Sequence, residues 1–266
     1  MSTLSPTASA GEPAPRADVL ACAIDRVDLA GALARCEEAI ATRSYVQHMA
    51  INAAKLVAMR DDPELTRVVR GCELVTADGQ AVVWASRVLR DPLPERVAGI
   101  DLMEALLARA ADRGWRVYIL GARQEVLDEA VRRLRTRHPG LQLAGCRDGY
   151  FAAEEEDEVA AEIAAARADV LFVAMSSPRK ELFLGRHGPQ MGVPFVMGVG
   201  GAIDVVSGIT KRAPRLMQRL GLEWLYRLLQ EPRRLFRRYA VTNARFVELV
   251  LRERLQRRRR TRSAAS

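Results

Sequence analysis

Residues 114–197 read GWRVYILGARQEVLDEAVRRLRTRHPGLQLAGCRDGYFAAEEEDEVAAEIAAARADVLFVAMSSPRKELFLGRHGPQMGVPFVM, and strand and helix patterns alternate within them at short intervals. The strand segments, RVYIL and VLFVA among them, are continuously apolar rather than alternating. Such runs are typical of strands that are covered on both faces. The stretch therefore predicts an α/β fold, a Rossmann-like sandwich with a largely parallel sheet.

The same alternation extends toward the N-terminus, so the sheet should include strands from the first half of the chain. Strands are predicted at Val19–Ala23, Tyr45–Ile51, Glu73–Thr76, Arg116–Leu120, Leu141–Cys146, Val170–Ala174 and Pro194–Met197. Helices are predicted at Leu29–Thr42, Pro63–Gly71, Asp101–Arg113, Gln124–His138, Glu154–Arg167 and Pro178–His187.

Parallel sheets bind their ligands beyond the carboxyl ends of the strands. The loops that follow the predicted strands are therefore where a site is expected. These loops are Ala77–Gln80, Gly121–Arg123, Arg147–Phe151, Met175–Pro178 and Gly198–Asp204.

Positive charge is concentrated at the C-terminal end of the chain. The 266 residues include 41 Lys or Arg and 33 Asp or Glu, a net charge of +8. Residues 211–262 hold 17 of the basic residues and four acidic ones, so this segment carries +13 and the remainder −5. An acidic body with a basic end predicts that the end meets a polyanion, either nucleic acid, an anionic membrane or a phosphate-bearing substrate.

Three segments are expected from these patterns. Residues 1–17, MSTLSPTASAGEPAPRA, lack the basic and apolar regions of a signal peptide and should form a disordered leader. Residues 18–210 form the α/β core. Residues 211–266 form a basic helical appendage, with two or three amphipathic helices broken at Gly221 and Pro232.

Cysteine usage and hydropathy suggest a cytoplasmic protein. Four cysteines are spread along the chain without a CxxC pair, and the three histidines lie at no zinc-binding spacing, so no metal site is expected. No apolar run approaches the ~18 residues that a membrane-spanning helix needs. Any membrane contact is therefore expected to be peripheral.

Asp78 is the first candidate catalytic residue, because it follows a predicted strand and precedes Gly79 and a helix. A carboxylate that is partly desolvated in a cleft can serve as a general base. The alternative is an ordinary N-cap aspartate.

The segment GVGGAIDVVSG, residues 198–208, is a candidate phosphate-binding turn, because glycines let backbone amides approach an oxyanion. Its spacing is GxGG rather than GxGxxG, and no acidic residue follows ~20 positions later, which argues against a nicotinamide dinucleotide. A tight turn used only for packing remains the alternative.

Arg96 closes a loop just before the helix that begins near Asp101, and its guanidinium is suited to a bidentate contact with phosphate. A surface pair with Glu95 or Asp101 is the alternative. The SPRKE segment, residues 177–181, is ambiguous in the same way.

Basic and aromatic residues interleave in the appendage, where Trp224, Tyr226, Phe236 and Tyr239 lie among the arginines. Basic amphipathic helices with aromatic anchors suit an anionic bilayer, at about 1 kcal/mol per basic residue near the headgroups. Nucleic acid binding and an ordinary packed helix are the alternatives.

Taken in order, these motifs resemble the WecG/TagA/CpsF glycosyltransferases, glycosyltransferase family 26. The resemblance covers roughly residues 45–248. It is carried by ADG at 77–79, ERVAGIDL at 95–102, ILGA at 119–122, GYF at 149–151, SPRKE at 177–181, GVGGAIDVVSG at 198–208, RAP at 212–214 and GLEWLYRLLQEPRRLFRRY at 221–239.

The resemblance implies an inverting, metal-independent transfer of a sugar from a UDP-sugar, typically UDP-N-acetylmannosamine. The implied acceptor is an undecaprenyl-diphosphate-linked sugar on the cytoplasmic leaflet, reached by an enzyme attached peripherally to the inner face of the membrane. No cofactor and no nucleic acid partner are implied.

The resemblance also assigns roles to residues. Asp78 matches the proposed general base, Asn52 a cleft residue beside it and Arg96 an active-site arginine. The candidate substrate-binding residues are Lys180, Gly121, Tyr150, Gly198, Gly200, Gly201 and Asp204, together with Arg212, Arg219, Arg227, Arg234 and Arg237, which match the family only by region.

Two departures bear on the substrate. The chain has Ala50, Ile51 and Asn52 where the family usually has Thr-Pro-Asn, and Lys180 stands where the family usually has glutamine. A cation in place of a neutral amide can engage a carboxylate or a phosphate. We therefore expect a donor other than UDP-N-acetylmannosamine, either an acidic or an unsubstituted hexose.

A non-catalytic nucleotide-binding or nucleic-acid-binding module is the competing hypothesis. It predicts tight, strongly salt-dependent binding of the basic appendage to DNA or RNA. Clustering of Asp78, Arg96 and the glycine segment at strand ends favours the enzyme instead. The sequence leaves open the donor sugar, the acceptor linkage and whether the chain forms a homo-oligomer.

Overall fold

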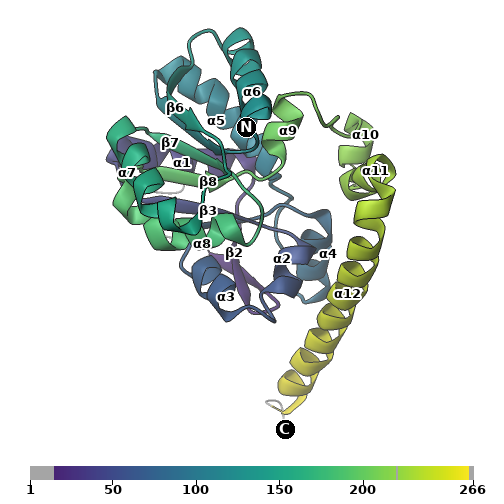
Figure 1. Cartoon of the computed structure of the whole chain (residues 1–266). Coiled ribbons are helices and arrows are strands. Elements are labelled where there is room, and N and C mark those ends of the chain that lie inside the picture. The colour runs from purple at the N-terminus through teal and green to yellow at the C-terminus, as the bar shows by residue number, and fades with distance from the viewer. Residues whose placement is uncertain (1–14, 220, 264–266) are drawn as a thin grey trace, which may run out of the picture.

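The computed structural model describes residues 15–219 and 221–263, without the side chains at 219, 234, 235, 237, 238 and 261–263 (Figure 1). Within this part, a parallel sheet of six strands has the order β4-β3-β8-β7-β5-β6, and helices cover both of its faces. The predicted α/β sandwich with a parallel sheet and a C-terminal helical appendage is confirmed.

The strands of the sheet lie within two residues of the predicted positions. Buried apolar side chains dominate all of them except the edge strand β6, whose residues are intermediate or exposed. The bounds are β3 Val46–Ile51, β4 Leu74–Ala77, β5 Arg116–Gly121, β6 Gln142–Arg147, β7 Val170–Ala174 and β8 Phe195–Gly198.

The prediction of one strand at Val19–Ala23 was wrong. Two short antiparallel strands, β1 Arg16–Val19 and β2 Cys22–Asp25, form a hairpin there. Leu20 and Ala21 form the turn, with φ of 57° and 61°. Two-residue hairpin turns of this kind normally contain asparagine or glycine, so the sequence carried no turn signal. Strand β1 also starts inside the expected leader, whose residues 1–14 lie outside the described part of the chain.

The helices of the core agree with the predicted ones, and α2, α9 and two 3₁₀ turns are additional. Asp28 caps α1 and Asp62 caps α3, each accepting a hydrogen bond from the third residue beyond it. The bounds are α1 Leu29–Thr42, α2 Ala53–Ala58, α3 Pro63–Arg70, α4 Gln80–Val88, α5 Gly99–Arg113, α6 Gln124–Arg137, α7 Glu156–Ala166, α8 Arg179–His187 and α9 Ala202–Val206.

The helices form two layers around the sheet. Helices α1, α5, α6 and α9 cover one face, where Leu106 and Phe172 are fully buried. Helices α7 and α8 cover part of the other face, and α2, α3, α4 and the hairpin complete it. Because the strands are parallel, all their carboxyl ends lie along one edge, and β3 lies between β4 and β8.

The appendage consists of α10 Arg215–Arg219, α11 Glu223–Gln230 and α12 Pro232–Ser263, with the breaks at Gly221 and Pro232 as predicted. Gly221 has φ of 70°, and a Cβ there would lie 2.5 Å from the Cβ of Gln80, so a larger residue would clash with α4. No described helix has the length and apolarity needed to cross a bilayer.

Helix α12 returns along the core and packs against α2 and α4 (Figure 1). Phe246 and Val250 are buried in the same apolar cluster as the hairpin. Arg245 forms a bidentate pair with Asp61, at 2.7 and 2.8 Å. The appendage is therefore anchored by a shared apolar core as well as by charge.

We expect Phe246→Ala to lower the free energy of unfolding by about 3 kcal/mol, because it leaves a cavity between α12 and the core. Val247→Ala is the control, since that side chain is 55% exposed on the same helix and should cost under about 0.5 kcal/mol. Urea unfolding measures both. Equal losses would contradict the packing of α12.

Candidate active site

Asp78 lies directly after β4, and its carboxylate reaches across to the start of α5. Oδ1 accepts a hydrogen bond from the Gly99 amide at 2.9 Å, while the Asp78 amide donates to the Ile51 carbonyl at 2.8 Å. The N-cap of α4 is Gly79, so Asp78 is not the N-cap aspartate that the sequence left open. Among the described residues, Oδ2 has no hydrogen-bond partner, which leaves one carboxylate oxygen available to a ligand.

Asn52 lies next to Asp78, after the neighbouring strand β3. Its side chain caps α2 by accepting a hydrogen bond from the Lys55 amide at 3.0 Å. A Cβ placed on Gly79 would lie 3.5 Å from the Asn52 Cβ, so the two strand-end loops are in contact. The parallel pairing of Ile51 with Ala77 brings them together.

A buried group of three charges lies beside these loops. Glu181 Oε1 is 2.8 Å from the Nζ atoms of both Lys55 and Lys180. Glu181 is 1% exposed and each lysine 9%. The stem of Lys180 lies against Gly198, where an added Cβ would be 3.0 Å from its Cε. Lys180 is thus held by a carboxylate of the chain itself, at the end of β8.

The ionisation of this group follows from its burial. Burial and the neighbouring Lys55 lower the pKa of Lys180, while Glu181 and Asp78 act in the opposite direction. Burial alone would raise the pKa of Glu181, but the two ammonium groups outweigh it and lower that pKa to about 2. Asp78 and Lys180 are therefore electrostatically coupled.

A second group of charges joins the core to the appendage. Arg96 Nη1 lies 2.7 Å from Oε2 of Glu223, and its Nη2 lies 3.9 Å from Asp101. Arg212 lies 2.5 Å from Asp101 and 3.5 Å from Glu223. The pairing of Arg96 with Asp101 was an alternative in the sequence, whereas Glu223 was not expected as a partner.

A cavity of about 450 Å³ adjoins this second group, lined by Arg96, Asp101, Arg212, Arg215 and Gln218. The segment before α5 links the cavity to Asp78, because the Val97 amide donates to the Ala77 carbonyl and Gly99 donates to Asp78. Arg96 therefore lies three residues before the amide that holds Asp78, although Asp78 itself does not line the cavity.

The glycine segment is tightly bonded to the neighbouring strand. The amides of Val199 and Gly200 both donate to the Val173 carbonyl, at 2.9 and 3.3 Å. Both amides are therefore already hydrogen-bonded at the carboxyl edge of the sheet. A Cβ on Gly201 would lie 3.3 Å from Oδ2 of Asp204, which places that carboxylate over the turn.

Gly121 ends β5 and Tyr150 follows β6, farther along the edge, and the structure does not bring them to Asp78. Gly121 has φ of 122°, and a Cβ there would lie 2.5 Å from the Ala174 carbonyl carbon, so close packing of β5 on β7 requires glycine. Tyr150 is 71% exposed.

Of the appendage arginines predicted to bind substrate, the structure describes the side chains of only two. Arg212 joins the second charged group, and Arg227 is exposed on α11 without an ion pair to any residue that the structure describes. The side chains of Arg219, Arg234 and Arg237 lie outside the described part.

Sequence reasoning missed Lys55, Glu181 and Glu223 as members of the site. Lys55 carries the clearest signal, since it is a lone charge in the apolar helix segment AAKLVA. A lone charge in a buried helix usually has a partner. Across the described residues, no three His, Cys, Asp or Glu side chains are arranged to hold a metal ion.

We expect Glu181→Gln to lower the free energy of unfolding at pH 7 by about 3 kcal/mol, because it leaves two buried ammonium groups without a carboxylate. The pKa of Glu181 falls from 4.5 to about 2 on folding. Its ionisation therefore stabilises the fold above about pH 4.5, and this contribution is lost as the pH falls toward 2.

The difference between Glu181→Gln and the unmodified chain should accordingly shrink between pH 4.5 and 2, as measured by urea unfolding across that range. Glu158→Gln, at an exposed site on α7, is the control and should show little change. A difference that does not depend on pH would contradict the proposed ionisation.

A protein-family model described as the glycosyl transferase WecG/TagA/CpsF family matches residues 17–260. The match includes the sheet, both charged groups and nearly all of α12.

Proposed function

Because the chain belongs to the WecG/TagA/CpsF family of glycosyltransferases, which act in cell-surface polysaccharide synthesis, we propose that it transfers a sugar from a UDP-sugar to an undecaprenyl-diphosphate-linked acceptor, with inversion at the anomeric carbon. The observation that carries the proposal is the position of Asp78. Its carboxylate is held by one oxygen at the carboxyl edge of the sheet, beside an arginine-lined cavity.

Asp78 is the proposed general base. Oδ2 takes the proton from the acceptor hydroxyl as that oxygen attacks the anomeric carbon and the bond to UDP breaks. The hydrogen bond from Gly99 to Oδ1 supports this role, since it holds the carboxylate in one orientation.

Arg96, Arg212 and Arg215 are proposed to bind the diphosphate of the donor. Negative charge develops on the leaving UDP, and guanidinium groups fixed in a partly desolvated cavity stabilise it. Asp101 and Glu223 pair with Arg96 and Arg212 in the structure. The diphosphate would compete with these carboxylates for the same donors.

Lys180 is proposed to select the donor sugar. It is a buried cation coupled to Asp78, at a position where the family usually has glutamine. An amide both donates and accepts hydrogen bonds, whereas an ammonium group only donates. This difference supports an acidic or unsubstituted hexose over an N-acetylated one.

The appendage is proposed to hold the enzyme on the anionic inner face of the membrane, where a lipid-linked acceptor is found. Large apolar side chains remain exposed along it beside the arginines, which is the composition that interfacial helices need. They are Leu216, Trp224, Leu229, Phe236, Val241, Val247, Leu251 and Leu255.

Asp78→Asn is expected to lower the rate of transfer to a purified lipid-linked acceptor by at least 100-fold, because the amide cannot accept the proton. Product is measured by mass spectrometry. Asp112→Asn, at an exposed site on α5, is the control. A loss below tenfold, or about 1.4 kcal/mol, would remove Asp78 from the role of base.

A donor panel tests the role of Lys180. We expect kcat/KM for UDP-glucose or UDP-glucuronate to exceed that for UDP-N-acetylmannosamine. Lys180→Gln should shift the preference toward the N-acetylated donor. Preference of the unmodified enzyme for UDP-N-acetylmannosamine would refute this specificity.

A further inference from the structure

A second, smaller cavity lies where the end of α4 meets the C-terminal half of α12. Its volume is about 200 Å³. Two apolar residues and four arginines line it: Val88, Leu89, Arg90, Arg254, Arg257 and Arg258. Four of these six described lining residues are arginines and none is acidic.

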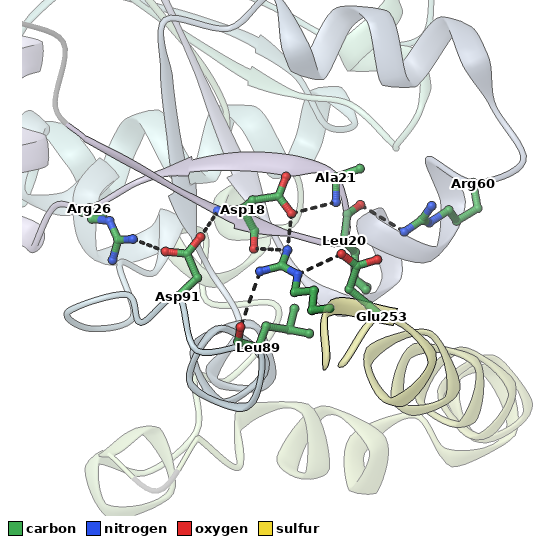
Figure 2. Close-up of polar contacts among 9 residues, drawn as sticks. Asp18, Leu20, Ala21, Arg26, Arg60, Leu89, Asp91 and Glu253 are labelled. Carbon is green, nitrogen blue, oxygen red and sulfur yellow. Dashed lines mark hydrogen bonds and ion pairs between the residues drawn. The ribbon is translucent and has the colours of Figure 1, made fainter. Parts of the chain in front are cut away.

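Arg257 fixes the geometry of this cavity. Its guanidinium donates to the Asp18 carboxylate at 2.5 Å, the Glu253 carboxylate at 2.9 Å and the Leu89 carbonyl at 3.5 Å. Figure 2 shows Asp18, Leu89 and Glu253 converging on this point from the hairpin, the end of α4 and α12. Arg257 therefore links the two walls of the cavity, α12 and the end of α4, to the hairpin.

The other three arginines have no ion pair with any residue that the structure describes. The nearby carboxylates are already engaged, since Asp91 pairs with Arg26 and accepts from the Asp18 amide at 2.7 Å (Figure 2). Guanidinium groups match phosphate oxygens in a bidentate way. The cavity thus has three guanidinium groups that can donate hydrogen bonds to a phosphate and that no described carboxylate neutralises.

The surface beside the cavity is apolar. Leu251 and Leu255 are 52% and 58% exposed. Leu251 lies three residues before Arg254 and Leu255 three residues before Arg258, so each leucine is next to one of these arginines on the surface of α12. Phe246 and Val250 are buried, and Val250 lies four residues before Arg254, so the buried side of α12 borders the cavity. A phosphate bound by the arginines would therefore have exposed leucines next to it.

We propose that Arg90, Arg254 and Arg258 bind the phosphate of an anionic phospholipid headgroup, while Leu251 and Leu255 contact its acyl region. This inference rests on the proposed attachment of the appendage to a membrane. It goes further by assigning a discrete headgroup site, separate from the cavity beside Asp78. Free phosphate has the same polar chemistry but gains nothing from the exposed leucines.

The experiment compares two triple variants that lose the same charge, one arginine at or just beyond the end of α4 and two on α12. The site variant is Arg90→Gln/Arg254→Gln/Arg258→Gln. The control variant is Arg87→Gln/Arg259→Gln/Arg260→Gln, in which all three arginines are exposed and lie outside the cavity. Arg257 stays unchanged because it anchors α12. Circular dichroism checks that both variants are folded.

Cosedimentation with phosphatidylcholine vesicles that contain phosphatidylglycerol gives the partition coefficient. If the arginines act only through diffuse electrostatic attraction, the loss of three of them lowers the partition coefficient equally in both variants. A headgroup site predicts a coefficient at least tenfold lower for the site variant than for the control variant. Equal losses would overturn the proposal.

A second arm distinguishes lipid from free phosphate. Inorganic phosphate, compared with chloride at matched ionic strength, should raise the Tm of the unmodified chain and of the control variant by more than it raises the Tm of the site variant, which keeps the arginines of the first cavity. If this holds while vesicle binding falls equally, the site takes free phosphate and the lipid assignment is wrong. The lipid assignment would also be overturned if only the site variant lost binding to DNA while the two variants bound vesicles equally.

Transfer to a water-soluble acceptor analogue separates this inference from the proposed function. The site variant should keep transfer within twofold of the unmodified enzyme, because its substitutions lie outside the proposed catalytic cavity. An unmodified chain that transfers no sugar from any UDP-donor would refute the proposed function, while the vesicle comparison would still decide the headgroup site.

Discussion

The parallel pairing of β3 with β4 on one side and β8 on the other is the constraint on which the site depends. Parallel strands present all their carboxyl ends at the same edge, so three loops distant in the chain meet there. Asn52 follows β3, Asp78 follows β4 and Gly198 is the last residue of β8. Lys180, from the helix after β7, lies against Gly198 and completes the group.

Charged side chains gather at this edge, where carboxylates of the chain itself pair with the basic groups. Two buried lysines share the carboxylate of Glu181, and two arginines share Asp101 and Glu223. Buried charges persist only when they are paired. The second group differs from the first because it adjoins an open cavity and includes a partner from the appendage, so an anionic ligand can exchange with its carboxylates.

The appendage combines two surfaces on one helix. Phe246 and Val250 pack on the core, whereas Leu251 and Leu255 are exposed near Arg254 and Arg258, which form no ion pair within the described part of the chain. An ordinary surface helix would present a polar outer face. The exposed side of α12 is instead both apolar and basic, while its buried side packs against α2 and α4.

The sequence by itself determined the α/β class, most strand positions and the helix breaks at Gly221 and Pro232, because these depend on local apolar runs and on backbone chemistry. Strand-end position also singled out Asp78 before any contact was known. The hairpin turn at Leu20 was missed because neither of its turn residues carries the usual local signal.

Only the tertiary structure decided which charges pair. Glu223 reaches Arg96 across 127 positions of chain, and Glu181 reaches Lys55 from another helix. Periodicity reports which face of an element is apolar, but it contains no information on which distant element packs there. The partners of the site therefore followed from strand order and helix packing, which no local stretch of sequence encodes.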